Sequence, residues 1–235
     1  MDKGINTIAK NLSYQMKNIE IVANNLANIN STGYKKELPF AEYLSRAESK
    51  DIKQITDYTE GIFTSTGNPL DLAISGDGFF MVKTDRGLEI TKNGKFSLTE
   101  DGDLITAMGN KVMSAKGEIN ISDMKLDKNK QLVITKEGEI KIGEDTVDKL
   151  MIVKVENPEK LIRTEHQNFF LEDEDYKTAD EENYNLIQGY LEESNTNPIL
   201  EMQAMIGINK DYETAQKIVN SMDRIMGLSN EVGKV

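Results

Sequence analysis

The chain has 235 residues, with 40 Asp and Glu against 28 Lys and Arg, a net charge of −12 and a pI near 4.7. An average field of this sign repels a phosphate backbone, so we expect no nucleic acid partner. The sequence contains no cysteine, which excludes disulfides and thiolate metal sites. No apolar stretch typical of a cleaved signal peptide or a membrane span is readable, so we expect no direct membrane insertion and, if the chain is exported, a route that leaves its N-terminus intact.

Residues 1–33 are predicted to form one long helix, because apolar residues recur at alternating steps of three and four positions. Only Gln15 interrupts the series, and Gly33 supplies an end. A repeat near 3.5 residues is typical of a helix that winds around partner helices. The members of this seam are Ile5, Ile8, Leu12, Ile19, Val22, Leu26 and Ile29.

Residues 196–235 are predicted to form a second long helix, with the same alternating spacing of apolar residues. Asn197 and Pro198 predict the start of the helix, because Asn accepts hydrogen bonds from the first turn and Pro fits the first helical position. The second apolar seam consists of Met205, Ile208, Tyr212, Ala215, Val219, Met222 and Met226. We expect the two long helices to pair with each other as a coiled coil.

The middle of the chain changes to short runs divided by turn dipeptides, which predicts strands. Asn93-Gly94 and Asp101-Gly102 are typical of two-residue hairpin turns, and we expect Phe79 and Phe80 to point to opposite faces, one into the core and one towards a neighbour or solvent. The expected strands cover residues 79–84, 88–91, 95–99, 104–107, 131–136, 139–142 and 150–156. The predicted fold class is therefore α+β, with terminal helices at 1–33 and 196–235, a connector at 34–67 and a central antiparallel β-rich domain at 68–195.

Charge divides along the same lines. Residues 1–36 and 196–235 together carry +2, which leaves −14 on residues 37–195. The nearly neutral ends can pack while the acidic middle stays solvated. Further apolar residues lie beside or opposite the two seams, namely Met16, Ile21, Ala23, Met202, Ile206, Ile218 and Ile225. We infer that the paired ends pack against the ends of other copies, while an ordinary intramolecular helical hairpin is the alternative.

Three blocks, in the same order, resemble bacterial flagellar rod and hook proteins. Residues 23–35 (ANNLANINSTGYK) resemble their N-terminal signature, residues 67–80 and 91–96 resemble the start of their β domain, and residues 188–198 (QGYLEESNTNP) resemble the segment before their C-terminal helix. The signature positions are Asn24, Asn25, Leu26, Asn28, Gly33, Asn68, Pro69, Leu70, Asp71, Gly76, Gly78, Phe79, Asn195, Asn197 and Pro198.

The resemblance implies a structural subunit of the flagellar basal-body rod, a hollow shaft that transmits torque to the hook. It implies two helices per subunit in an inner tube of coiled coils and the β domain outside it. The implied partners are copies of the chain, other rod and hook proteins and the flagellar type III export apparatus, and the implied location is the basal body. Compact size and a short connector favour the proximal rod, with a distal-rod or hook-like subunit as the alternative. A non-polymerising secreted binding module is the alternative from another class.

The Asn cluster at positions 24, 25, 28 and 30 is poor in helix propensity, so we expect it to have a function. Its side chains either bridge backbone groups of neighbouring subunits or face a wet channel, with capping of a fraying helix end as the simpler alternative.

No catalytic, cofactor-binding or metal-binding site is predicted, and we expect the chain not to be an enzyme. His166 is the only histidine and is expected at the surface. The acidic stretch at 172–183 lacks the spacing and the glycine of a calcium loop, so we expect a solvated loop. Gly76-Asp77-Gly78 is not followed by the Lys-Ser or Lys-Thr of a phosphate loop, which favours a turn into a strand.

Overall fold

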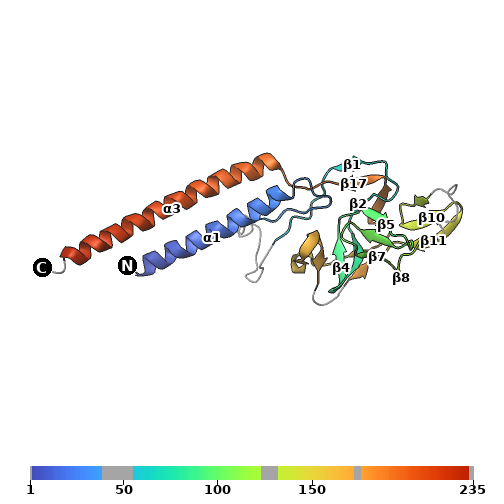
Figure 1. The fold of residues 1–235 in the computed structure, drawn as a ribbon, viewed down its shortest axis with the longest axis horizontal. Helices are drawn as coiled ribbons and strands as arrows, with labels where there is room; N and C mark the ends of the chain where they lie inside the picture. Colours follow the sequence, from blue (N-terminus) through green and yellow to red (C-terminus); the bar gives the residue numbers. More distant parts are fainter. Residues whose placement is uncertain (1, 39–54, 123–131, 172–175, 233–235) are drawn as a thin grey trace.

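A computed structural model describes residues 2–38, 55–122, 132–171 and 176–232. Two long helices, α1 (Asp2–Ala27) and α3 (Pro198–Val232), run antiparallel and side by side away from a β-rich body, and both termini lie at the far end of this helix pair (Figure 1). Among the described residues, α1 packs against α3, and neither helix packs along a strand. The α+β class and the antiparallel β-rich middle are confirmed.

Helix α1 ends at Ala27, six residues before the predicted end at Gly33. The Asn side chains explain this difference, because Asn28 Nδ2 donates to the Asn24 carbonyl (2.9 Å) and Ser31 Oγ donates to Asn28 Oδ1 (3.1 Å). The Asn28 side chain thus shares the Asn24 carbonyl with the last helical bond, and beyond it the backbone changes to turn bonds, such as that from the Ser31 N–H to the Asn28 carbonyl (3.1 Å). Ile29 therefore lies in a turn and not on the helical seam, so its assignment to the helix is corrected.

Helix α3 begins where the sequence predicts. Asn197 Oδ1 accepts from the backbone N–H groups of Ile199 (3.0 Å) and Leu200 (3.3 Å), and Pro198 is the first helical residue. This is an N-cap that satisfies donors of the first turn.

The β-rich body contains short strands and two 3₁₀ turns, and the bounds follow in chain order. The elements are β1 (Phe63–Ser65), β2 (Leu72–Gly76), β3 (Phe79–Thr84), β4 (Gly87–Thr91), β5 (Phe96–Leu98), β6 (Leu104–Thr106), β7 (Lys111–Ser114), β8 (Gly117–Glu118), β9 (Leu132–Ile134), β10 (Glu139–Ile142), β11 (Asp145–Lys149), β12 (Ile152–Lys154), η2 (Pro158–Lys160), β13 (Ile162–Arg163), η3 (Glu165–Gln167), β14 (Phe169–Phe170), β15 (Lys177–Thr178), β16 (Tyr184–Gln188) and β17 (Tyr190–Glu192).

The largest sheet has the order β13-β14-β4-β3-β7-β6-β5, with β12, β15 and β8 attached, and every pairing in it is antiparallel. The other sheets are β11-β10-β9, β16-β2 and β1-β17. All seven predicted strand segments contain a strand; Gln131, at the start of one segment, lies outside the described residues. The predicted connector also contains one strand, because β1 pairs with β17 immediately before α3.

The hairpin predicted at Asn93-Gly94 is wrong. Strand β4 pairs with β3 and β14, while β5 pairs with β6, and Gly94 does not have a positive φ angle. The backbone at Gly94 instead bonds β2, since its carbonyl accepts from the Leu72 N–H (3.0 Å). Asp101-Gly102 does lie between the paired strands β5 and β6, and Gly102 has φ +88°, but residues 99–103 join the strands, so the turn is longer than the predicted two residues.

The large sheet is covered on both faces. Phe80 lies in one apolar cluster with Leu72, Phe96 and Ile152, whereas Phe79 lies in a second cluster with Ile90 and Phe169. Phe79 and Phe80 therefore point to opposite faces, as predicted, but neither is exposed. Tyr58, from the segment before β1, packs against Phe79 and Phe169 in the second cluster, a contact that alternation within one strand does not reveal.

Candidate functional site

The predicted seam of α3 lies on the less exposed side of the helix. Its described side chains are half-buried, while the flanking Met202, Ile206 and Ile218 are exposed. The half-buried seam residues are Met205, Ile208, Tyr212, Ala215, Val219 and Met222. The side chain of Met226 lies outside the described part of the chain.

Helix α1 buries a different set of residues most deeply. Val22 is fully buried, as a seam residue should be, but Asn18, Ile21 and Asn25 are buried beside it. The remaining described seam residues, Ile8, Leu12, Ile19 and Leu26, are half-buried, and the Ile5 side chain lies outside the described residues. Met16 is 58% exposed. One apolar flank of α1 thus stays open to solvent although α3 lies beside it.

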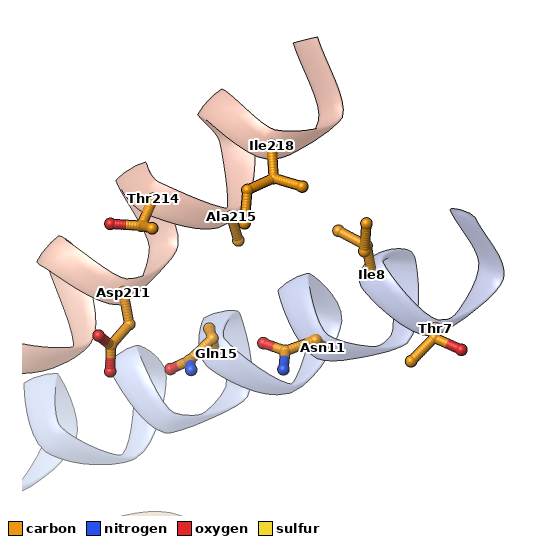
Figure 2. Close-up of a pocket in the computed structure, with 8 residues that line it drawn as sticks. All are labelled: Thr7, Ile8, Asn11, Gln15, Asp211, Thr214, Ala215 and Ile218. Carbon is orange, nitrogen blue, oxygen red and sulfur yellow. The ribbon is translucent and has the colours of Figure 1, made fainter. Parts of the chain in front are cut away.

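The free halves of the two helices enclose a groove with a volume of about 300 Å³. Figure 2 shows Asn11 and Gln15 of α1 opposite Asp211 and Ala215 of α3, with the helices farther apart towards Ile8 and Ile218. Polar groups and this open space mean that the pair is poorly packed at its free end.

The other end of the helix pair meets the β body at a compact junction, which we define as residues 33–37 after α1 and 192–197 before α3. Gly33 has φ +66°, and its N–H donates to the Glu192 carbonyl (2.7 Å). A Cβ at Gly33 would lie 2.6 Å from the backbone of Lys92 and Asn93. Both the conformation and the close approach require glycine here.

Asn25 ties the end of α1 to the junction. It is fully buried, and its Oδ1 accepts from the Glu37 N–H (2.9 Å) and the Tyr34 hydroxyl (3.0 Å), while its Nδ2 donates to the Glu37 carbonyl (2.8 Å) and to Glu201 Oε2 of α3 (3.4 Å). Burial raises the pKa of Tyr34 to about 12, so its hydroxyl remains a donor. Asn25 therefore bonds within its own chain, whereas Asn24 and Asn30 are exposed.

A buried ion pair closes the junction. Lys35 Nζ lies 2.6 Å from Glu192 Oε1, and both side chains are 0% exposed. Lys35 also donates to the Thr59 carbonyl (2.7 Å), and Glu192 Oε1 accepts from the Gly61 N–H (2.8 Å). Glu192 Oε2 is buried without a hydrogen-bond partner among the described residues.

Asn195 and Arg163 add further ties. Asn195 Oδ1 accepts from the Lys36 N–H (2.8 Å), and its Nδ2 donates to the Asp57 carbonyl (2.8 Å). The Arg163 guanidinium of β13 lies 4.7 Å from the Tyr34 ring centroid, and its Nε is 3.0 Å from Glu37 Oε1. The two chain segments that reach the helices are therefore bonded to each other and to the β body.

The second signature block shapes the start of the β body. Asn68 Oδ1 accepts from the Leu70 N–H (3.3 Å) and its Nδ2 donates to the buried Asp71 (3.0 Å), with Pro69 between them. A Cβ at Gly76 would lie 2.3 Å from the Asn183 carbonyl oxygen, and one at Gly78 would lie 2.7 Å from Ile152 Cγ2. These positions serve packing within the chain.

Sequence reasoning missed four charged residues of this region as site residues. Lys35, Lys92 and Glu192 fall inside the quoted blocks but are not among the predicted signature positions, and Arg163 lies in a segment without a predicted strand. These side chains are buried because segments far apart in the sequence pack together, and the local sequence pattern does not predict such packing.

Within the described residues, no group of three or more His, Asp or Glu side chains is arranged to hold a metal ion, and no helix is long and apolar enough to cross a membrane. His166 is exposed, as expected. Of the acidic stretch 172–183, residues 172–175 lie outside the described residues.

Three family models match the chain in sequence order. They are described as flagella basal body rod protein (residues 5–35), flagellar hook protein FlgE/F/G D1 domain (73–142) and flagellar basal body rod FlgEFG protein C-terminal (187–232). Together these matches span more than half of the chain and include both helices and the first part of the β body.

Curated relatives cover nearly the whole chain. The flagellar basal-body rod protein FlgF of Caulobacter vibrioides is 28% identical over 246 residues, covering 98% of this chain and 99% of the relative. FlgF of Mesorhizobium japonicum is 27% identical, covering 88% and 89%, and the rod protein FlgG of Agrobacterium fabrum is 27% identical, covering 94% and 95%. Since these matches agree with the order of the helices and the β body, the chain belongs to the family of flagellar basal-body rod proteins.

Proposed function

We propose that the chain is a proximal-rod subunit of FlgF type, whose helix pair packs with those of other copies into a hollow shaft that carries torque to the hook. Membership of the rod family makes it a structural subunit located in the basal body of the cell envelope. The observation that carries the proposal is a helix pair that projects from the β body with apolar side chains still exposed along it.

The choice of FlgF over FlgG follows from chain length. The FlgF relatives align over 219–246 residues, close to the 235 of this chain. The FlgG relatives align over 248–269 residues, so they carry more inserted residues relative to this chain than the FlgF relatives do. A distal-rod or hook-like position remains the alternative.

The proposed interface between copies combines the two seams with the exposed residues beside them. Leu12, Met16, Ile19, Ala23 and Leu26 follow heptad spacing along the flank of α1, and α3 leaves Met16 and Ala23 exposed. Helix α3 exposes Ile199, Met202 and Ile206 near the junction. Each face needs a further helix to exclude water, and other copies of the chain supply such helices.

Assembly tests this interface directly. Met16→Asp and Ile206→Asp each place a charge where a neighbouring helix must pack, so we expect either change to abolish sedimenting assemblies of the purified chain at rising concentration. Met108→Asp is the matched control, because Met108 is equally exposed (60%) but lies on the β body. Equal assembly of all three variants would refute the helical interface.

The position in the shaft needs a separate experiment. Electron microscopy of basal bodies from a strain that lacks this chain should show rods truncated near the base, because a proximal subunit precedes all later ones. Rods that lose only their outer half would instead assign the distal position.

We also propose export through the flagellar type III apparatus, which tagged-chain secretion assays in an export-deficient strain would test.

A further inference from the structure

The direction of the helix pair depends chiefly on the junction, with one further bond from Gln167 Nε2 of the β body to Asn28 Oδ1 just after α1 (3.1 Å). Helices α1 and α3 pack against each other, and among the described residues neither packs along a strand of the β body (Figure 1). Helix α3 has 35 residues and is therefore about 50 Å long at about 1.5 Å per residue. A change of about 10° at the junction would displace its far end by about 9 Å. Small contacts at the junction thus control a large displacement.

Three buried charged side chains lie within and beside the junction, namely Lys35, Lys92 and Glu192, which we call the junction cluster. Lys35 comes from the segment after α1, Glu192 from β17 before α3, and Lys92 from the β body after β4. Glu192 is fully buried with Lys35, and Lys92 is 5% exposed. The cluster therefore joins all three parts that meet here.

Lys92 lies close to Gly33, which is in the segment that follows α1. A Cβ at Gly33 would lie 2.6 Å from the Lys92 backbone. Lys92 Nζ donates to the Gly76 carbonyl (3.1 Å) and lies 5.3 Å from the Phe79 ring centroid. Burial lowers the pKa of Lys92 to about 8. Among the groups that face it, Glu192, Glu60 and Asp77 act to raise that pKa and Lys35 acts to lower it.

A buried ion pair contributes little net stability compared with apolar side chains, but loss of one partner leaves the other charge buried alone. A buried ion pair therefore favours the one arrangement of the two chain segments in which the charges are paired, over arrangements that leave either charge buried alone. Here that arrangement places the end of α1 against the strand that leads into α3.

We propose that Lys35 and Glu192 are positioning residues that fix the direction of the helix pair relative to the β body, with Lys92 making this coupling sensitive to protonation. The coupling is a property of the single chain and does not require that the chain polymerise. Opening the junction exposes Lys92 to water, so protonation favours the open state, and a rise in pH above about 8 favours the closed one.

Distances between paired spin labels test the proposal on the full chain, and the absence of native cysteine makes labelling specific. Labels at Lys116 and Lys217 measure the distance from the β body to α3. Labels at Lys116 and Lys136 report on the β body alone, and labels at Lys10 and Lys217 report on the helix pair alone. All four positions are exposed.

Glu192→Gln should broaden the distance distribution across the junction several-fold and leave both internal distributions unchanged. Glu193→Gln is the matched control, because Glu193 is the exposed neighbour on the same chain segment, and it should leave all three distributions narrow. An unchanged cross-junction distribution in Glu192→Gln would overturn the proposal. Broadening of all three would also overturn it, because the pair would then support the fold and not the direction.

A pH series separates a positioning role from a merely structural one. In the wild-type chain, the cross-junction distribution should narrow between pH 7 and pH 9.5, and in Lys92→Met it should not depend on pH. A wild-type width that is constant over this range, with the internal distances constant as well, would exclude the role of Lys92. Failure of the chain to assemble would test the proposed function separately, since these measurements use dilute monomer.

Discussion

Gly33→Ala tests whether the junction requires glycine for two separate reasons. The first is the conformation, since φ +66° costs a residue with a Cβ about 1–2 kcal/mol. The second is space, because the new Cβ would lie 2.6–2.7 Å from three backbone atoms of Lys92 and Asn93, which cannot move aside as a flexible side chain would. Overpacking of this kind costs about 1–3 kcal/mol more. We expect a total loss of about 2–5 kcal/mol in the free energy of unfolding.

Gly67→Ala is the matched control for this prediction. Gly67 has nearly the same conformation, φ +71°, but a Cβ there meets nothing within 4 Å. The control therefore measures the conformational cost alone, about 1–2 kcal/mol. Urea unfolding of both variants, followed by circular dichroism, gives the difference that is due to the contact. A loss in Gly33→Ala no larger than in Gly67→Ala would refute the reasoning, because the close approach to Lys92 would then carry no energy.

Three further predictions concern the junction and the core. Asn25→Leu should lower the free energy of unfolding in urea by about 2–4 kcal/mol, because it leaves the buried Glu37 N–H and carbonyl unpaired. The exposed control Asn24→Leu should change it by less than about 0.5 kcal/mol, and equal losses in the two variants would exclude the Asn25–Glu37 hydrogen bonds. Phe80→Ala should cost about 3–5 kcal/mol by calorimetry, since the ring is fully buried, and a loss below about 1 kcal/mol would mean that the core is not as described. The pKa of Lys92 is lowered from 10.5 to about 8 in the folded chain. Between these pH values the unfolded chain binds more protons than the folded chain, so the free energy of unfolding should rise with pH from 8 upwards. The full rise up to pH 10.5 should be on the order of 3 kcal/mol. Urea titrations of the wild-type chain and Lys92→Met from pH 7 to 9.5 should show this rise only in the wild type.

The sequence predicts the regular elements well where the signal is local. The start of α3 at Pro198 follows from the cap that Asn197 provides, and strands such as β3 and β10 coincide with the predicted runs 79–84 and 139–142. Helix α1 ends earlier than predicted, because the apolar repeat continues through Ile29 while the Asn28 side chain already competes for a backbone carbonyl. At the end of α1, the hydrogen bonds of the Asn side chains and not the apolar repeat determine where the helix stops.

Contacts between distant segments were beyond local patterns. Asn93-Gly94 has the composition of a hairpin turn, but β4 and β5 pair with other strands, so its backbone bonds β2 instead. Phe79 and Phe80 alternate as predicted, yet the number of covered faces depends on segments more than 70 residues away. Strand pairing partners are set by tertiary packing and not by composition.

The Asn cluster, for which bonds to neighbouring subunits are one role that the sequence suggests, includes Asn25 near the end of α1, while Gly33 and Asn195 lie in the segments that join the helices to the β body. The structure places all three in bonds within the chain, where the helix pair joins the β body. In the proposed shaft, each subunit must present its helices at a fixed angle before a neighbouring subunit can pack against them. Residues that set this angle are therefore as restricted as residues that touch a neighbour, and the two kinds are distinguished by burial: Asn25 is buried in the single chain, whereas Met16 is exposed.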